Sequence, residues 1–174
     1  MSRSNAALAP APFGACKIDT DKARLDLALI HAVLVRSHWA KGIPFAVMKT
    51  AIDNSLAFGL YRGERQIGFA RVVTDHATFA YLADVFVVAE ERGRGLGRWL
   101  IETILAHRDL QGLRRWLLGT RDAQGLYRGC GFTEPPRGFD FLERLDPGVY
   151  RKNPLPSGLP KGRGDSGQAR SAAP

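Results

Sequence analysis

The residues best suited to chemistry form a loop rich in glycine and arginine, Arg92-Gly93-Arg94-Gly95-Leu96-Gly97, which Arg98 follows. Glycine has no Cβ, so the backbone of such a loop can take φ > 0 and approach a ligand closely. If the loop opens a helix, the first N–H groups of that helix lack intrahelical partners and lie at the positive end of its dipole. These donors and the arginine charges together predict a site for a pyrophosphate.

The spacing of the glycines distinguishes among phosphate-binding loops. A dinucleotide fingerprint requires G-x-G-x-x-G, but after Gly93 and Gly95 the third glycine position holds Arg98. A Walker loop requires Gly-Lys-Ser or Gly-Lys-Thr, and neither occurs in the chain. The loop instead fits Arg-x-x-Gly-x-Gly, with Arg92, Gly95 and Gly97 at the fixed positions.

A strand before the loop and a helix after it would hold it in place. Residues 81–88 are β-branched and aromatic, as strands are, and the acidic turn that follows reads as solvated at Glu90 and Glu91. Apolar residues then recur at helical spacing, at Leu96, Leu100, Ile101, Ile104 and Leu105. The pattern therefore predicts a strand, a glycine-rich loop and a helix in direct succession.

Two motifs in this order resemble the GCN5-related N-acetyltransferase (GNAT) superfamily, in its small bacterial form. Its first signature is the Arg-x-x-Gly-x-Gly loop, which in that family binds acetyl-coenzyme A. Its second signature, Ala-x-x-x-Tyr-x-x-x-Gly-Phe, is met by Ala123, Tyr127, Gly131 and Phe132. The resemblance covers roughly residues 18–145, and it implies an acyltransferase that moves an acetyl group from acetyl-coenzyme A to an amine.

The same resemblance implies an α/β (α+β) fold. Its mixed, mostly antiparallel sheet should have about six to seven strands, with about four helices on both faces and a splay between strands at the cofactor site. The apolar patterns predict strands at 17–19, 56–62, 66–74, 115–118 and 139–145 and from 78 onward. They predict helices at 21–36 and 45–52 and from 96 and 122 onward.

Length and composition indicate one acetyltransferase domain at residues 15–150. The 174 residues are 45% hydrophobic, which suits a globular domain. Residues 1–14, rich in alanine and proline, and the basic, proline- and glycine-rich residues 151–174 are expected to be disordered. The chain has neither an 18-residue apolar run nor a signal peptide, so we expect a cytoplasmic protein that does not enter a membrane.

Charge and cysteine content exclude other classes of protein. The net charge is +8, but residues 151–174 carry +4 and Arg3 another +1, which leaves +3 for residues 15–150 and argues against a nucleic-acid partner. Cys16 and Cys130 form no Cys-x-x-Cys pair, and no histidine cluster has metal-ligand spacing. Neither a disulfide scaffold nor a metal site is therefore expected.

The resemblance also implies which residues bind the cofactor. The backbone of the central strand should contact it, with the Val87 N–H as the donor to the thioester oxygen. Tyr127 should protonate the departing thiolate, a transfer that is uphill by only ~2 kcal/mol from reference pKa values. The expected cofactor-binding set is Phe86, Val87, Val88, Arg92, Gly93, Arg94, Gly95, Leu96, Gly97, Arg98, Thr120, Asp122 and Tyr127. The sequence departs from the family at Thr120, where many members have asparagine, and at Ala89, where many have proline.

The general base is expected to be Asp84, because an alkylamine must lose its proton at a cost of ~4.6 kcal/mol at pH 7. Alternation along the strand places Leu82, Asp84 and Phe86 on one face, where a carboxylate is unusual. An ion pair between Asp84 and Arg71 of the adjacent strand is an equal alternative. Asp75, Tyr81 and the turn residues Glu90 and Glu91 are weaker candidates for the base.

The acceptor site is expected near the first two helices, which form one wall of the acceptor pocket in many acetyltransferases. Trp39 lies between them and is either an acceptor contact or a core aromatic residue. The expected acceptor-binding residues are Trp39, Arg71, Asp75 and Tyr81. The leading hypothesis is a small-molecule amine as acceptor and a monomer or homodimer. The rivals are transfer to a protein N-terminus, a lysine or an aminoacyl-tRNA, and a domain that binds acyl-coenzyme A without catalysis.

Overall fold

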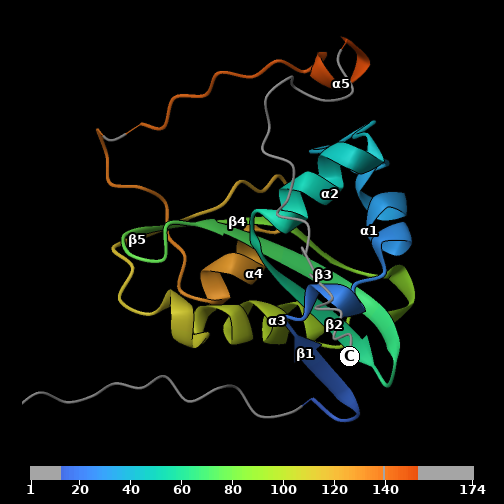
Figure 1. Ribbon diagram of the computed structural model, residues 1–174. Helices are drawn as coiled ribbons and strands as arrows, with labels where there is room; N and C mark the ends of the chain where they lie inside the picture. The colour runs from blue at the N-terminus through green and yellow to red at the C-terminus, as the bar shows by residue number, and fades with distance from the viewer. Residues whose placement is uncertain (1–12, 139, 153–174) are drawn as a thin grey trace, which may run out of the picture.

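A five-stranded sheet forms the centre of the computed structural model, which describes residues 13–138 and 140–152 (Figure 1). The strands lie in chain order: β1 Cys16–Asp19, β2 Leu56–Arg62, β3 Arg65–Thr74, β4 Phe79–Val87 and β5 Arg115–Leu117. β1 to β4 are antiparallel neighbours, whereas β5 runs parallel to β4. The sheet is thus mixed and mostly antiparallel, as predicted, but the described residues form five strands where six to seven were expected.

Helices cover both faces of the sheet, as the sequence predicted (Figure 1). α1 Leu27–Leu34 and α2 Phe45–Asp53 lie on one face, and α3 Leu96–Leu105 and α4 Gln124–Gly129 lie on the other. A four-residue helix, α5 Val149–Lys152, follows near α2. No helix in the described part of the chain is long and apolar enough to cross a membrane.

The helix predicted at 21–36 is divided, because two aspartates each start a helical segment. The Asp21 side chain accepts from the N–H of Ala23 at 2.9 Å and caps a 3-10 turn at Lys22–Arg24. The chain then extends through Leu25, and the Asp26 side chain accepts from the N–H of Leu29 at 2.9 Å to begin α1. The apolar periodicity continues through both segments and so predicted one helix. The two capping aspartates instead start two separate helical segments, with extended backbone between them.

Two groups of buried side chains join the helices to the sheet. On one face, α1 and α2 bury Ile30, Leu34, Met48 and Ile52 against the sheet. On the other, α3 buries Leu100, Ile101 and Ile104 with Phe58, Val72, Ala80 and Leu82. Full burial of each such aliphatic side chain stabilises the fold by about 1.5–3 kcal/mol. These contacts fix α3, and with it the loop that opens this helix.

The strand predicted at 139–145 is not formed at 140–145, and residue 139 lies outside the described part. β5 is three residues long and offers a neighbouring strand few backbone partners. Phe141, Leu142 and Leu145 are consequently exposed. The disorder expected for 1–14 and 151–174 falls largely on residues outside the described part; within it, residues 151 and 152 end α5.

Candidate active site

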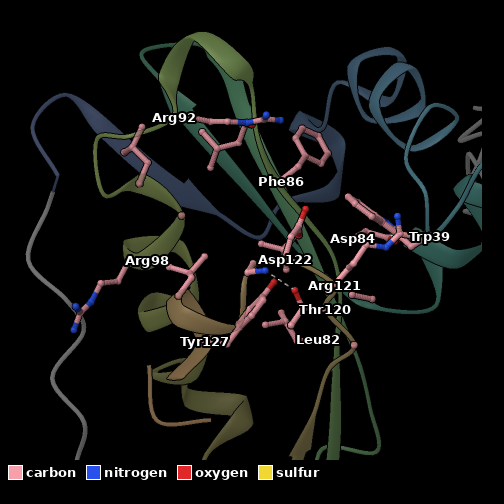
Figure 2. Close-up of a pocket in the computed structure, with 18 of the residues that line it drawn as sticks. Trp39, Leu82, Asp84, Phe86, Arg92, Arg98, Thr120, Arg121, Asp122 and Tyr127 are labelled. Atoms are coloured by element: carbon pink, nitrogen blue, oxygen red, sulfur yellow. Dashed lines mark hydrogen bonds between the residues drawn. The ribbon is translucent and has the colours of Figure 1, made fainter. Parts of the chain in front are cut away.

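A cavity of about 810 Å³ opens beside β4 (Figure 2). Five segments line it: the α1–α2 loop, β3 through Arg71, β4, the loop into the first turn of α3, and the β5–α4 segment together with α4. Figure 2 shows Tyr127, Thr120 and Asp122 grouped on one side and Trp39 with Asp84 on another. The tertiary structure therefore gathers both family motifs around a single hollow.

The glycine-rich loop has the backbone conformation that its sequence predicted. Gly93 and Gly95 have φ of 74° and 82°, in the left-handed region that favours glycine. Gly95 is the N-cap of α3, and no side chain caps the N–H groups of the first turn. A Cβ added to Gly97 would lie 3.8 Å from Leu126 Cδ2 and 4.0 Å from Val87 Cγ2, which both line the cavity. This cradle of backbone donors fits a phosphate group.

Each arginine of the loop has a partner within the protein. Arg92 Nε donates to the Val87 carbonyl oxygen at 2.9 Å, which closes the loop back onto the end of β4. Arg94 Nη1 lies 3.2 Å from Glu91 Oε2. Arg98 Nε donates to Glu102 at 2.7 Å, and its side chain points away from Tyr127 in Figure 2. The backbone N–H groups of α3 are therefore the donors most directly available to an anion.

Glu91, read from the sequence as solvated, is buried beneath the loop. Its side chain accepts from Arg62 Nε at 3.0 Å and from Arg62 Nη2 at 2.9 Å. The hydrogen bond from Arg62 is the main reason that the pKa of Glu91 is lowered. Glu91 lines the cavity as well, so its pair with Arg62 ties the start of the glycine-rich loop to the end of β2.

β4 splays away from β5, as the family resemblance implied. The two strands pair only at Phe79–Tyr81, so the rest of β4 runs free of β5 along the cavity. The Val88 N–H donates to the Ile67 carbonyl of β3 at 2.9 Å. Because successive N–H groups in a strand point to opposite sides, the Val87 N–H faces away from β3, toward the side from which β5 has diverged.

A bulge in β4 breaks the alternation that the sequence predicted. The register with β3 shifts between Phe69 and Arg71, and Asp84 has a φ of 55°. Leu82 consequently packs with the α3 cluster, whereas Phe86 packs with the cluster of α1 and α2. The expectation that Leu82, Asp84 and Phe86 share one face is therefore wrong, because an extra residue reverses the pleat.

Asp84 forms the ion pair with Arg71 that the sequence left open. Arg71 Nε lies 2.5 Å from Asp84 Oδ2, and Arg71 Nη1 donates to Ser55 Oγ at 3.3 Å. The other carboxylate oxygen, Oδ1, accepts from Trp39 Nε1 at 3.2 Å. Trp39 is 50% exposed, so it is not the core aromatic residue of the alternative interpretation.

Tyr127 extends from α4 into the cavity and is half-buried. Its ring packs edge-on against Phe132 at 6.0 Å between centroids. Burial raises the pKa of Tyr127, and the nearby Cys130, Asp122 and Tyr81 act in the same direction. The phenol is therefore held in its protonated, hydrogen-bond-donating form.

Most of the residues predicted for the site line this cavity. They are Trp39, Arg71, Tyr81, Asp84, Phe86, Val87, Arg92, Gly93, Gly95, Leu96, Gly97, Arg98, Thr120, Asp122 and Tyr127. Val88 is buried in the core, and Arg94 is held by Glu91. Asp75 is not among the residues that line the cavity and belongs to a turn. The hydrogen bond from the Thr78 hydroxyl is the main reason that the pKa of Asp75 is lowered, and the N–H groups of Thr78, Ala77 and Phe79, which donate to Oδ1, lower it further.

Several residues at the cavity were not singled out from the sequence. His38 and Arg121 are direct neighbours of predicted site residues, which was the only signal for them. The Thr120 hydroxyl accepts from the Ala123 N–H at 3.1 Å and thus holds the start of α4. In the described residues, no three His, Cys, Asp or Glu side chains gather as metal ligands.

Comparisons with known proteins agree with this geometry. The family model for the acetyltransferase (GNAT) domain matches residues 53–134. A "putative acetyltransferase" of Gibberella zeae is 33% identical in a 133-residue alignment that covers 63% of this chain and 74% of that protein. A solved Xanthomonas campestris protein described as belonging to the GNAT family is 51% identical, with a TM-score of 0.74 over 78% of this chain and 96% of that one.

A more distant structure shares the fold alone. AAC(6')-Iy, solved in complex with the bisubstrate analogue CoA-S-monomethyl-acetylneamine, is 20% identical to this chain. Its TM-score is 0.57, and the match covers 75% of this chain and 99% of that one.

Proposed function

Because this chain belongs to the GNAT family of acetyltransferases, we propose that it transfers the acetyl group of acetyl-coenzyme A to the amine of a small molecule. Its family makes it an acyltransferase. The proposal of acetyl-coenzyme A as the donor and a small-molecule amine as the acceptor rests on the cavity. The observation that carries it is the meeting of an uncapped helix N-terminus with left-handed Gly95 and a protonated Tyr127 around one hollow.

Different parts of the cavity suit different parts of acetyl-coenzyme A. The first turn of α3 provides N–H donors for the pyrophosphate, and Gly97 keeps the space between Leu126 and Val87 open for it. The side of β4 from which β5 has splayed provides the outward-facing Val87 N–H for the thioester oxygen. The related fold of AAC(6')-Iy holds an analogue that joins coenzyme A to an acceptor, which supports direct transfer with both substrates bound.

In the proposed reaction the acceptor nitrogen bonds to the thioester carbonyl carbon and the C–S bond breaks. Coenzyme A leaves as a thiol once it takes one proton. The acceptor ammonium gives up two protons on the way to the amide: one to the base before attack, and one after the N–C bond forms, which replaces the proton given to the thiolate. Tyr127 supplies the donor for the thiolate, and full transfer from a phenol to a thiolate costs only ~2 kcal/mol from reference pKa values. A hydrogen bond from its phenol therefore stabilises the leaving group.

Asp84 is the proposed base for the acceptor ammonium. A carboxylate has about four acceptor positions, and Arg71 and Trp39 fill two of them. The remaining lone pairs can accept a proton directly or through a water. Deprotonation of an alkylamine costs ~4.6 kcal/mol at pH 7, so a base placed here contributes to the rate.

The first experiment compares two variants that place the same charge at the same helical position. Gly97 is the second residue of α3 and lines the cavity, whereas Gly125 is the second residue of α4 and has no atom within 4 Å of an added Cβ. A glutamate at either position is favourable for the helix dipole. Gly97→Glu should therefore fold normally but repel the pyrophosphate.

Thermal unfolding with and without acetyl-coenzyme A measures the effect. At 100 times its dissociation constant, the ligand should stabilise the wild type and Gly125→Glu by ~2.7 kcal/mol and Gly97→Glu by much less. A wild type that shows no stabilisation would refute the cofactor assignment. An equal response in all three proteins would place the cofactor away from α3.

A further inference from the structure

Two large aromatic side chains that line the cavity are partly exposed to solvent. Trp39, in the α1–α2 loop, is 50% exposed, and Tyr81, on β4, is 40% exposed. Both line the cavity, together with Asp84 and Arg71. Val73, the cross-strand partner of Tyr81 on β3, is exposed as well. Exposed aromatic surface around a cavity is typical of a binding site for an apolar ligand body.

Trp39 is held in place by a chain of hydrogen bonds across four segments. Its indole N–H donates to Asp84 of β4, which pairs with Arg71 of β3, and Arg71 donates to Ser55 at the start of β2. The ring of His38 meets the indole edge-on at 4.9 Å between centroids. An exposed aromatic ring that is fixed in this way offers a preformed contact surface.

Asp84 adopts an uncommon backbone conformation to take part in this chain. Its φ of 55° is left-handed, and only one other non-glycine residue, His76, has a positive φ among the described residues. Such strain persists where the surrounding structure imposes it, and it gathers at functional sites. Here it places both carboxylate oxygens where Trp39 and Arg71 reach them.

The charged groups next to Trp39 balance one another, because Arg71 is paired with Asp84. Elsewhere in the cavity lining, Arg121 and Asp122 add one charge of each sign. An acceptor with many hydroxyl or ammonium groups needs many polar partners, because unpaired polar groups in a cavity are costly. The aromatic faces of Trp39 and Tyr81 instead match a flat apolar body that carries one amine, and an ammonium is attracted to such faces.

We propose that Trp39 and Tyr81 form the acceptor platform, and that the acceptor is a primary amine attached to an aromatic or similarly flat apolar group. Asp84 then has a second role as the positioning residue for Trp39. This inference rests on the proposed acetyltransferase function, because the amine must lie next to the thioester at the Val87 end of β4.

The test measures thiol release from acetyl-coenzyme A with matched primary amines. Tryptamine and 2-phenylethylamine represent the proposed class, and ethanolamine and glucosamine represent polar amines. For the wild type, kcat/KM should be at least roughly tenfold higher for the aromatic amines. Trp39→Leu should remove most of that preference through KM, so that kcat/KM falls more for the aromatic amines than for ethanolamine.

Two further variants separate stacking from positioning. Trp39→Phe keeps a ring but loses the donor to Asp84, so KM for tryptamine should rise less than in Trp39→Leu, and the preference for aromatic amines should persist in part. Phe45→Leu is the matched control, because Phe45 is 45% exposed on α2 and does not line the cavity. It should leave both amine classes unchanged.

The possible results test the acceptor platform separately from the proposed acetyltransferase function. Stabilisation by acetyl-coenzyme A without any thiol release from a broad amine panel would contradict the small-molecule function itself. Release that is equal for polar and aromatic amines, or a Trp39→Leu variant that keeps the aromatic preference, would overturn the acceptor platform and leave the acetyltransferase assignment intact.

Discussion

Tyr127 illustrates how its surroundings adapt one residue to a chemical task. Its phenol lies in the cavity on α4, and burial is the largest cause of its raised pKa. The protonated form therefore prevails up to and beyond about pH 10. Asp122 and Cys130 reinforce the effect, since negative charge nearby disfavours a phenolate. A donor that stays protonated suits a leaving thiolate.

Replacing Tyr127 with phenylalanine tests this role at a single oxygen atom. We expect kcat to fall by about a hundredfold, at the low end of general acid catalysis, with stabilisation by acetyl-coenzyme A close to that of the wild type. Steady-state rates and thermal unfolding on the same preparations measure both. The wild-type rate should not decline between about pH 7 and about pH 10 through ionisation of Tyr127. Unchanged kcat in the variant would mean that the ring only packs against Phe132.

At the scale of elements, the tip of the β2–β3 hairpin holds the turn that precedes the glycine-rich loop. Arg62 binds the buried Glu91 through two hydrogen bonds, and Arg65 binds the exposed Glu90. Arg94 meets Glu91 from the other side at 3.2 Å. Two arginines thus share one buried carboxylate, and the position of the loop depends on a hairpin some thirty residues earlier in the chain.

Glu91→Gln should lower both the stability of the protein and its affinity for acetyl-coenzyme A, because two guanidinium groups lose their shared counter-charge. Glu90→Gln is the matched control next to it, since its ion pair is exposed and contributes little.

Because the pKa of Glu91 is lowered in the folded state, its contribution to the stability is present above about pH 4.3 and is lost as the pH falls further. Chemical denaturation at about pH 7 and about pH 3 should show a larger stability difference between wild type and Glu91→Gln at the higher pH. If Glu91→Gln and Glu90→Gln lowered the stability equally at pH 7, the buried pair of Glu91 with Arg62 would not be what holds the loop.

Across the whole molecule, the described core lies within the proposed domain of residues 15–150. The two clusters and the apolar side chains packed against them run from Cys16 to Tyr150. Every segment that lines the cavity falls between His38 and Tyr127. Much of the net charge of +8 is carried by residues 151–174. Fold and site therefore depend on residues that precede the basic segment.

A chain that ends at residue 152 should keep the unfolding transition and the acetyl-coenzyme A response of the full chain. The reason is that both clusters remain complete in the shorter chain. Differential scanning calorimetry at several salt concentrations compares the two proteins. The contrary outcome has two parts: the shorter chain is stabilised less by acetyl-coenzyme A, and added salt reduces the stabilisation of the full chain to the same level. That outcome would show that basic residues beyond 152 attract the cofactor.

The local parts of the site could be predicted from the sequence because they depend on local rules. Glycines at fixed spacing after an apolar strand specify a loop with left-handed positions, and the structure places Gly93 and Gly95 there. Apolar periodicity located α2 and α3 and the β2–β3 hairpin, since each buries one regular face. The second motif placed Tyr127 on α4.

The tertiary structure decided what depends on partners distant in the chain. Alternation could not reveal the bulge at Asp84, because an extra residue shows only against the register of β3. Glu91 is an ordinary turn residue until Arg62 of another strand reaches it. Trp39 becomes a fixed, exposed ring only through its bond to Asp84. Sequence alone thus determined the family and the loop, whereas the neighbours that folding brings together determined which side chains line the cavity.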